Sequence, residues 1–350
     1  MKRRLFNRAI MVATSLALVV SMLASCSGGG TSAGSNASSG GDKSAGDAAV
    51  TLRLGHTQPD DHLVNTTAKR FAELAKEYSG GSINIEIYPN STFGTAAEMN
   101  AAIQSGDLDL YFNATAQFAA QYAPFSVVDA WYIFEDTDHL MKFYSPDCDT
   151  YQQLCKGLED ACGIESMGAI YYGARQMTSN VPFNSMNDLK GQKMRVASDP
   201  MPTAFFEAMG AVPTPVAYNE TYLALQQKVA DGQENPCASI DSMKFYEVQD
   251  YLNLTYHQYQ MLTMFLSVET RGDLSDAQVD ALRKAALKAA DEHNAAAFDN
   301  EQAAIDKLSA HLEVIKPDLT AMMDACRKVY PDYESTWGAG VAAAIQALAG

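Results

Sequence analysis

Basic residues are scarce in this 350-residue chain: 25 lysines and arginines stand against 42 aspartates and glutamates, for a formal net charge of −17 at pH 7. Affinity for nucleic acid rests on Lys and Arg contacts with phosphates, and no basic tract follows the first few residues, so a nucleic-acid partner is excluded. With 23 glycines, 12 prolines and 47% apolar residues, the bulk is neither collagen-like nor disordered. The length suits about two soluble globular domains.

Signatures of enzymes are missing as well. The chain has no phosphate-binding G-x-x-x-x-G-K-[ST] loop, no G-x-G-x-x-G after a strand, and no H-E-x-x-H, G-x-S-x-G or EF-hand pattern. Six histidines are scattered without the spacing of metal ligands: His56, His62, His139, His257, His293 and His311. We therefore expect a protein that is not an enzyme and that needs neither a metal nor a cofactor.

Cysteine usage gives no redox or metal pattern. Five cysteines follow Cys26, namely Cys148, Cys155, Cys162, Cys237 and Cys326. The first three are spaced by seven, so on one continuous helix they share a face about 10.5 Å apart, beyond the reach of a disulfide. Buried free thiols are favoured over a redox or metal role, although the sequence leaves their pairing open.

The N-terminus has the features of a secretory signal. Lys2, Arg3, Arg4 and Arg8 precede an apolar run over 9–23 that is shorter than a bilayer span. The run ends in Leu-Ala-Ser-Cys26, which resembles the lipobox of bacterial lipoproteins, so residues 1–25 are expected to be removed and Cys26 lipidated. An ordinary signal peptide is the alternative. Removal of four basic residues and no acidic one would change the net charge from −17 to −21.

A linker follows the expected lipidation site. From 27 to 48 the residues are small or polar, so this stretch cannot bury enough surface to order itself. At about 5–6 Å × √n, its roughly 22 residues would span about 25 Å. We therefore expect a lipid-anchored protein on the outward-facing side of the membrane, with residues 26–48 as its tether.

The body alternates strands and helices. Residues 50–55 are typical of a strand, 59–78 of an amphipathic helix, 83–87 of a half-buried strand, 96–105 of a second helix and 108–112 of a third strand. This order predicts a parallel sheet with right-handed crossovers. A similar alternation restarts at 164–172 and includes strands near 193–197, 211–215 and 261–268. Two α/β lobes are the simplest interpretation.

A long helix is predicted beyond Arg271. Ser275 and Gln278 form a possible capping box, and no glycine or proline interrupts the chain until Pro317. A helix over 275–309 would be about 50 Å long and is expected to span both lobes. We assign 49–171 with about 261–300 to the N-terminal lobe, and 172–260 with about 301–350 to the C-terminal lobe.

Six ordered blocks between 171 and 257 carry a family resemblance. They are Gly173–Asn180, Asp188–Val196, Met209–Pro215, Tyr222–Gln227, Val229–Pro236 and Lys244–Gln249. Together they closely resemble the substrate-binding proteins of tripartite ATP-independent periplasmic (TRAP) transporters, the DctP family. Looser similarity covers about 50–330, including Ser79-Gly80-Gly81 and Tyr88-Pro89-Asn90.

The resemblance implies a fold and a function. The fold is a two-lobed periplasmic-binding-protein-like α/β fold with crossing connections, a hinge cleft and the long helix behind it. Such a protein captures an organic acid and delivers it to a membrane permease driven by an ion gradient; a monomer is expected. A ligand-sensing receptor of the same fold and a lipid-anchored surface enzyme are the alternatives.

The same motifs imply ligand-binding residues in the C-terminal lobe. Arg195, in a predicted strand, matches the arginine that binds the ligand carboxylate, and a planar guanidinium can do so through two parallel bonds. Arg175 matches a second pocket arginine. Asn235 matches an amide that donates to the same carboxylate, and Tyr218 an aromatic lining position.

Further candidates lie in the N-terminal lobe. Thr57 and Asn113 follow predicted strands, at the ends where open α/β sheets bind ligands. Trp131 replaces a Leu-Pro-type sequence of the family and is either an aromatic wall of the site or core filling. The family's sialic-acid-binding branch carries acidic residues where this chain has Thr95, Ala96 and Asn113, so sialic acid is disfavoured, and dicarboxylates, sugar acids, keto acids and aromatic carboxylates stay open.

Overall fold

The computed structural model describes residues 47–197 and 200–350. The expected signal peptide, Cys26 and the tether up to residue 46 lie outside the described residues. In the described part, no helix combines the length and the apolar character that a bilayer crossing requires.

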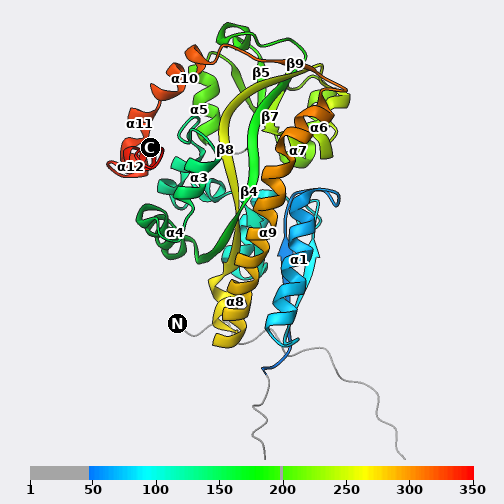
Figure 1. Ribbon diagram of the computed structural model, residues 1–350, viewed down its shortest axis with the longest axis vertical. Helices are drawn as coiled ribbons and strands as arrows, with labels where there is room; N and C mark the ends of the chain where they lie inside the picture. Colours follow the sequence, from blue (N-terminus) through cyan, green and yellow to red (C-terminus); the bar gives the residue numbers. More distant parts are fainter. Residues whose placement is uncertain (1–46, 198–199) are drawn as a thin grey trace, which may run out of the picture. The chain divides into compact units, whose positions relative to one another are not determined.

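Nine strands form one mixed sheet (Figure 1). Along the sheet they run in the order β2 (Ile83–Tyr88), β1 (Val50–Gly55), β3 (Leu110–Asn113), β8 (Tyr251–Ser267), β4 (Ile164–Ser179), β7 (Gly232–Pro236), β5 (Lys193–Val196) and β6 (Val212–Pro215), with β9 (Glu313–Ile315) paired to β8. β1 is parallel to both β2 and β3, and β5 is parallel to both β6 and β7. The parallel β-α-β-α-β start predicted from the sequence is confirmed.

Helices cover and extend this sheet. The α-helices are α1 (Leu63–Tyr78), α2 (Ala96–Ser105), α3 (Thr137–Phe143), α4 (Asp149–Cys162), α5 (Pro200–Ala208), α6 (Thr221–Gln226), α7 (Cys237–Ser242), α8 (Val268–Gly272), α9 (Asp276–Leu308), α10 (Thr320–Arg327), α11 (Tyr330–Trp337) and α12 (Val341–Gln346). Short 3-10 helices are η1 (Thr115–Phe118), η2 (Ala123–Asp129), η3 (Met186–Leu189), η4 (Tyr218–Glu220) and η5 (Phe245–Glu247).

Two long antiparallel strands connect the two halves of the sheet. β4 has 16 residues and β8 has 17, and they pair along most of their lengths. One end of β8, residues 263–266, pairs with β3, whereas its other end, residues 251–253, pairs with β9. The sequence predicted only 164–172 and 261–268 as strands, because the polar residues of their inner halves interrupt the apolar pattern. These halves are buried all the same and carry much of the site described below.

The predicted long helix is present as α9 and begins with the predicted capping box. The Ser275 hydroxyl accepts from the backbone N–H of Gln278 at 3.2 Å, and the side-chain oxygen of Gln278 accepts from the backbone N–H of Ser275 at 3.0 Å. Near its start α9 packs Leu282 and several alanines into the core around β1 and β3, whereas near its end Ile305 and Leu308 join the core under β8 and α7. Figure 1 shows α9 beside α1 and along the β4 and β8 pair. One helix therefore buttresses both halves.

Polar side chains of α9 also hold the middle of β4. Asn294 Oδ1 accepts from the Tyr171 N–H at 2.6 Å, and His293 Nε2 lies 2.8 Å from the Tyr171 carbonyl oxygen. Two turns further along, the Glu301 carboxylate accepts from the Tyr171 hydroxyl and from the Ala174 N–H. These bonds meet β4 where its register against β8 shifts, between Tyr171 and Gly173. The helix thus supplies partners where the ladder is interrupted.

The C-terminal helices pack against an earlier part of the chain. Trp337 donates its indole N–H to the Ser126 hydroxyl at 3.2 Å, and His139 Nε2 lies 2.7 Å from the Ile345 carbonyl oxygen. Through these and neighbouring contacts, α11 packs against η2, and α12 packs against α3 and α4. These contacts join segments that the predicted lobe division separates, and the lobe boundaries stay a prediction.

The five cysteines of the described residues are all free thiols. Cys162, Cys237 and Cys326 are buried, whereas Cys148 and Cys155 are only half-buried. Burial raises the pKa of the Cys155 and Cys162 thiols to about 11. They therefore stay protonated near neutral pH, which makes them poor nucleophiles.

The capping box of α9 gives a test of the fold. Ser275→Ala removes the acceptor for the Gln278 N–H and should lower the free energy of unfolding by about 1 kcal/mol, as loss of an N-cap does. Ser275→Asp keeps an acceptor at the same position and should stay close to the parent protein. Urea denaturation followed by circular dichroism measures both. Equal stability of the alanine and aspartate variants would show that this cap does not stabilise α9.

Candidate ligand-binding site

A cleft of about 440 Å³ lies between segments from both halves of the sheet. One wall comes from the turns after β1 and β2, from α2, and from β3 and the chain that follows it, all within residues 57–121. The other comes from Asp129 at the end of η2, from β4, β5, β7 and β8, and from the turn between β6 and η4. Most of these positions are strand ends and the turns that follow them, where α/β sheets place their ligands.

A buried ion pair forms the floor of the cleft. Arg175 on β4 binds the Glu234 carboxylate of β7 through both Nε and Nη2, and Nη1 donates to Gln260 Oε1 at 2.7 Å. The pairing of β4 with β7 sets the two residues on adjacent strands, and both are less than 10% exposed. Burial opposes charge on Glu234, but Arg175 and His257 more than offset it and lower the Glu234 pKa to about 2. Both partners are therefore charged at neutral pH.

His257 completes this pair from the side. Its Nε2 lies 3.2 Å from Glu234 Oε2, and its Nδ1 lies 2.8 Å from the Thr255 hydroxyl. Burial lowers the His257 pKa below its ordinary value, so the ring is neutral at pH 7 and donates from Nε2 while accepting from Thr255. The charges of Arg175 and Glu234 consequently cancel without a further ion.

Arg195 is different, because no carboxylate of the described residues forms an ion pair with it. It is 2% exposed, its Nε donates to the Val216 carbonyl at 3.0 Å, and its guanidinium lies 6.0 Å from the centre of the Tyr218 ring. Burial lowers the Arg195 pKa to about 10, which still leaves the side chain charged at neutral pH. The cleft therefore contains a buried cation that an anion can neutralise.

Asn235 lies beside the ion pair and lines the same cleft as Arg195. Its side-chain amide donates to Gln233 Oε1 at 2.6 Å, and its Oδ1 accepts from Arg175 Nη2 at 3.2 Å. Gln233 in turn donates to the Thr178 hydroxyl at 3.0 Å, so the orientation of the Asn235 amide is determined by buried partners. An NH₂ group carries two hydrogens, and the second one of Asn235 is available to a ligand.

A hydrogen bond joins the two walls. The Tyr218 hydroxyl, at the start of η4, donates to Gln58 Oε1 at 3.0 Å, and Gln58 follows β1. The neighbouring Tyr172 hydroxyl accepts from the Ser239 hydroxyl at 2.7 Å. Tyr218 thus contacts the opposite wall with its hydroxyl and flanks Arg195 with its ring.

Six of the seven predicted site residues line this cleft. The structure brings together Arg195, Arg175, Asn235, Tyr218, Asn113 and Thr57, which come from both halves of the chain. Their contact with a ligand stays a prediction. The sequence did not single out Glu234, Asp129, Gln258 or Gln260, and only Glu234 carried a usable signal, as the residue before Asn235 in a quoted block.

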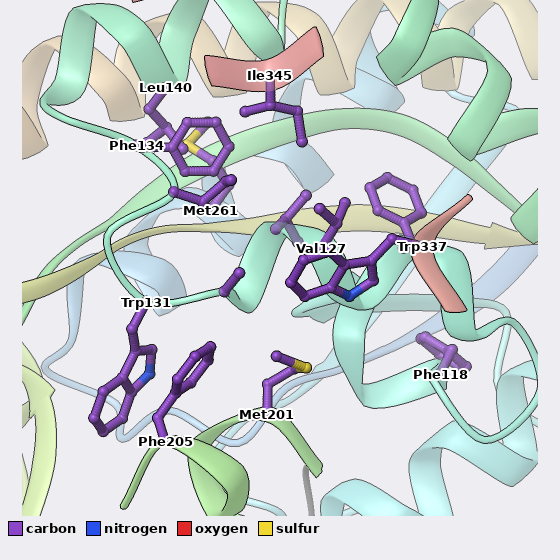
Figure 2. Close-up of a cluster of buried hydrophobic side chains, with 14 of the residues drawn as sticks. Phe118, Val127, Trp131, Phe134, Leu140, Met201, Phe205, Met261, Trp337 and Ile345 are labelled. Atoms are coloured by element: carbon purple, nitrogen blue, oxygen red, sulfur yellow. The ribbon is translucent and has the colours of Figure 1, made fainter. Parts of the chain in front are cut away.

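Trp131 is placed elsewhere. Its ring is fully buried, stacks on Phe205 at 5.4 Å between centroids and meets the edge of Phe206 at 4.9 Å, and it does not line the cleft. Figure 2 shows Trp131 beside Phe205 in the hydrophobic core. Of the two roles that the sequence left open, the structure therefore supports core filling. The Trp131 ring also packs on the ring of His257, with 4.3 Å between their centroids, and thereby supports a residue of the cleft floor.

Comparison with known proteins gives one consistent family. The family model described as "Bacterial extracellular solute-binding protein, family 7" (DctP) matches residues 54–336. The sialic acid-binding periplasmic protein SiaP of Vibrio cholerae serotype O1 is 30% identical over 306 residues, covering 86% of this chain and 94% of that protein.

Solved structures agree with this. A TRAP periplasmic solute-binding protein from Polaromonas sp. JS666, bound to D-erythronate, has a TM-score of 0.80 and 29% identity and covers 85% of this chain and 98% of its own. Another from Sulfurospirillum deleyianum, with bound succinate, has a TM-score of 0.81 and 25% identity, with coverages of 86% and 100%. The two-lobed fold expected from the sequence is confirmed.

The floor of the cleft can be tested by a mutant cycle. Glu234→Gln leaves Arg175 buried without a compensating charge and should lower the free energy of unfolding by about 3–5 kcal/mol. The double variant Arg175→Met/Glu234→Gln removes both charges and should be more stable than that single variant, because no lone charge is left buried. Chemical denaturation of the parent, both single variants and the double variant gives the coupling energy. Additive effects would mean that the pair does not act as a unit.

Proposed function

Because the chain belongs to the DctP family, the bacterial extracellular solute-binding proteins of family 7, we propose that it binds an organic acid in the cleft and delivers it to the permease of a TRAP transporter. One observation carries the proposal. Arg195 is a buried guanidinium without a carboxylate partner among the described residues, at the wall of a cleft large enough for a small molecule.

Each lining residue has a role in this proposal. Arg195 binds the ligand carboxylate through its two terminal nitrogens, since Nε already donates to Val216. Asn235 donates its second amide hydrogen to the same carboxylate. Arg175 orients the Asn235 amide while its own charge is neutralised by Glu234. Tyr218 packs against the ligand body, and Thr57 and Asn113 contact its far end.

In this proposal, the ligand is captured when the two walls close on it and is released when they separate. In this proposal the ligand replaces or reinforces the bond between Tyr218 and Gln58 and thereby favours the closed arrangement. Bending is confined to β4 and β8, which connect the halves, and α9 limits it from behind. Transport then uses an ion gradient across the membrane, and the protein itself performs no chemistry on the ligand.

The location is also part of the proposal. A signal peptide over 1–25, lipidation of Cys26 and a small-residue tether would hold a monomeric domain at the outer face of the membrane. The basic start, the apolar run of signal-peptide length and the Leu-Ala-Ser-Cys sequence support this arrangement.

Removal of the unpaired guanidinium tests the binding role. Thermal melting of the purified protein with D-erythronate, L-galactonate, succinate and pyruvate first identifies an acid that binds, because a ligand at 100 Kd adds about 2.7 kcal/mol. Arg195→Ala should then weaken that acid by roughly 30-fold to several thousand-fold in calorimetric titration, as loss of a buried charge partner costs about 2–5 kcal/mol.

A second arginine supplies the matched control. Arg327 on α10 is exposed and lies outside the cleft, so Arg327→Ala should bind the same acid like the parent protein. Arg195→Lys keeps the charge but not the two-pronged geometry and should fall between the other variants. Unchanged affinity in Arg195→Ala would refute the carboxylate role of this residue.

Lipidation has its own test. Mass spectrometry of the protein extracted from membranes should find an N-terminal peptide that begins at Cys26 and carries a diacylglyceryl group. Cys26→Ser should abolish that modification, whereas Cys148→Ser should keep it. An unmodified N-terminus at any residue of the parent protein would show an ordinary signal peptide instead.

A further inference from the structure

The wall of the cleft supplied by residues 57–121 is neutral and rich in amides. Six side-chain amides of this wall line the cavity: Gln58, Asn100, Gln104, Asn113, Gln117 and Gln121. Hydroxyls of Thr57, Ser91 and Thr95 accompany them. No lysine, arginine, aspartate or glutamate of this described segment lines the cavity.

Charged groups are confined to the other side. In the described part of the chain, the charged lining residues are Asp129, Arg175, Arg195 and Glu234. Arg175 and Glu234 cancel each other, so Arg195 is the cation that remains among the described lining residues. Asp129 is buried and accepts from the Gln258 amide at 2.7 Å. The described lining therefore offers one cation to one ligand carboxylate, and a second carboxylate would meet no further cation of that lining.

The amides are arranged to bind groups that both donate and accept. Asn113 donates to Asn100 Oδ1 at 3.0 Å, and Asn100 donates to the Gln117 carbonyl at 3.1 Å, which orients both side chains. Each amide keeps further donor and acceptor capacity, and no bond within the described residues engages the side chain of Gln117 or Gln121. Hydroxyl groups, which donate and accept at once, match such a wall, whereas methylene groups would leave it unsatisfied.

Small residues leave room for a ligand at this wall. Ala97, Asn100, Ala101 and Gln104 share one face of α2 and line the cavity together. Because the alanines have small side chains and stand between the two amides, they leave space for ligand atoms next to polar groups. A chain of hydroxyl-bearing carbons fits that surface better than a flat aromatic ring, which would cover the amides without satisfying them.

From these observations we infer that the ligand is a monocarboxylate with several hydroxyl groups, of the aldonic-acid class, and that the site rejects dicarboxylates and plain fatty or aromatic acids. This inference rests on the proposed function, since it takes the carboxylate to be held by Arg195. The inference adds that residues of α2, β3 and η1 bind the hydroxyl groups at the end of the ligand away from its carboxylate. Gln117 is a specificity-determining residue of that end.

Four chemically matched probes test the inference on the purified parent protein. A set of C4 to C6 aldonates, with D-erythronate, D-gluconate and D-galactonate among them, should include a ligand in calorimetric titration. For the best aldonate, the matching aldarate adds a second carboxylate, the unsubstituted alkanoate removes the hydroxyls, and the matching alditol removes the carboxylate. Each of the three should bind at least about 100-fold more weakly. The alkanoate leaves the amides unpaired, the alditol leaves the Arg195 charge buried without a partner, and the aldarate buries a second carboxylate without a cation.

The outcomes separate the inference from the proposed function. An aldarate, succinate or an alkanoate that binds as tightly as the best aldonate overturns the inference and leaves organic-acid binding intact. An alditol that binds as tightly as its aldonate refutes the carboxylate role of Arg195 and with it the proposed function. Binding of no acid in the set overturns both.

A charge introduced into the neutral wall gives a second, independent measurement. Gln117→Lys supplies the missing cation and should improve binding of the aldarate relative to the aldonate by at least about 10-fold. Gln117→Met keeps the length of the side chain without the charge and should not improve it. If the lysine variant discriminates between the two acids as the parent protein does, Gln117 does not face the second end of the ligand and that assignment is wrong.

Discussion

Neutralisation of Arg175 by Glu234 is the interaction on which the site depends. Two buried guanidinium groups in one cavity would repel each other and would both demand anions. Because Glu234 binds Arg175 through two nitrogens and also contacts His257, the first charge is cancelled within the protein, and in the proposed function the Arg195 charge is the one that meets the ligand. This pairing therefore sets how many ligand carboxylates we expect the cleft to accept. It also places Arg175 where its Nη2 orients the Asn235 amide.

The pair can exist only because one sheet passes through both halves. Arg175 lies on β4 and Glu234 on β7, while His257 and Gln260 come from β8, so three adjacent strands supply the floor of the cleft. β8 also pairs with β3, whose end carries Asn113. Side chains of α9 accept from and donate to the backbone of β4 where its register against β8 shifts, so these groups have partners where the ladder is interrupted. The same residues therefore set the geometry of the floor and limit the motion of the walls.

Much of the fold could be predicted from the sequence where the signals are local. The helix over 96–105 has the predicted bounds because the Thr95 and Glu98 capping box and the αL glycine Gly106 define both its ends. The full lengths of β4 and β8 could not be predicted, since their buried polar residues are satisfied by distant partners, as Arg175 is by Glu234 and Gln260, which lie 59 and 85 positions away. The role of Trp131 was undecidable for the same reason: only Phe205 and Phe206, more than 70 positions further along, make it a core residue. Motifs placed Arg195 in a strand correctly, but no local pattern shows that it forms no ion pair with a carboxylate of the described residues.

The acidic net charge of the protein repels an anionic ligand, and the distance over which this repulsion acts decides whether it matters for binding. The net charge of −17, and of −21 without residues 1–25, opposes the approach of a carboxylate from far away. Screening at physiological salt reduces such fields beyond about 8 Å, so the surface charge acts weakly on a ligand that has reached the cleft. Inside, Arg195 is buried among neutral amides and a cancelled ion pair, and its field is much less screened by solvent. If the proposed site is right, affinity is a local property of a few buried groups and the acidic surface affects the rate of encounter. Selection among acids then falls to the neutral wall of residues 57–121.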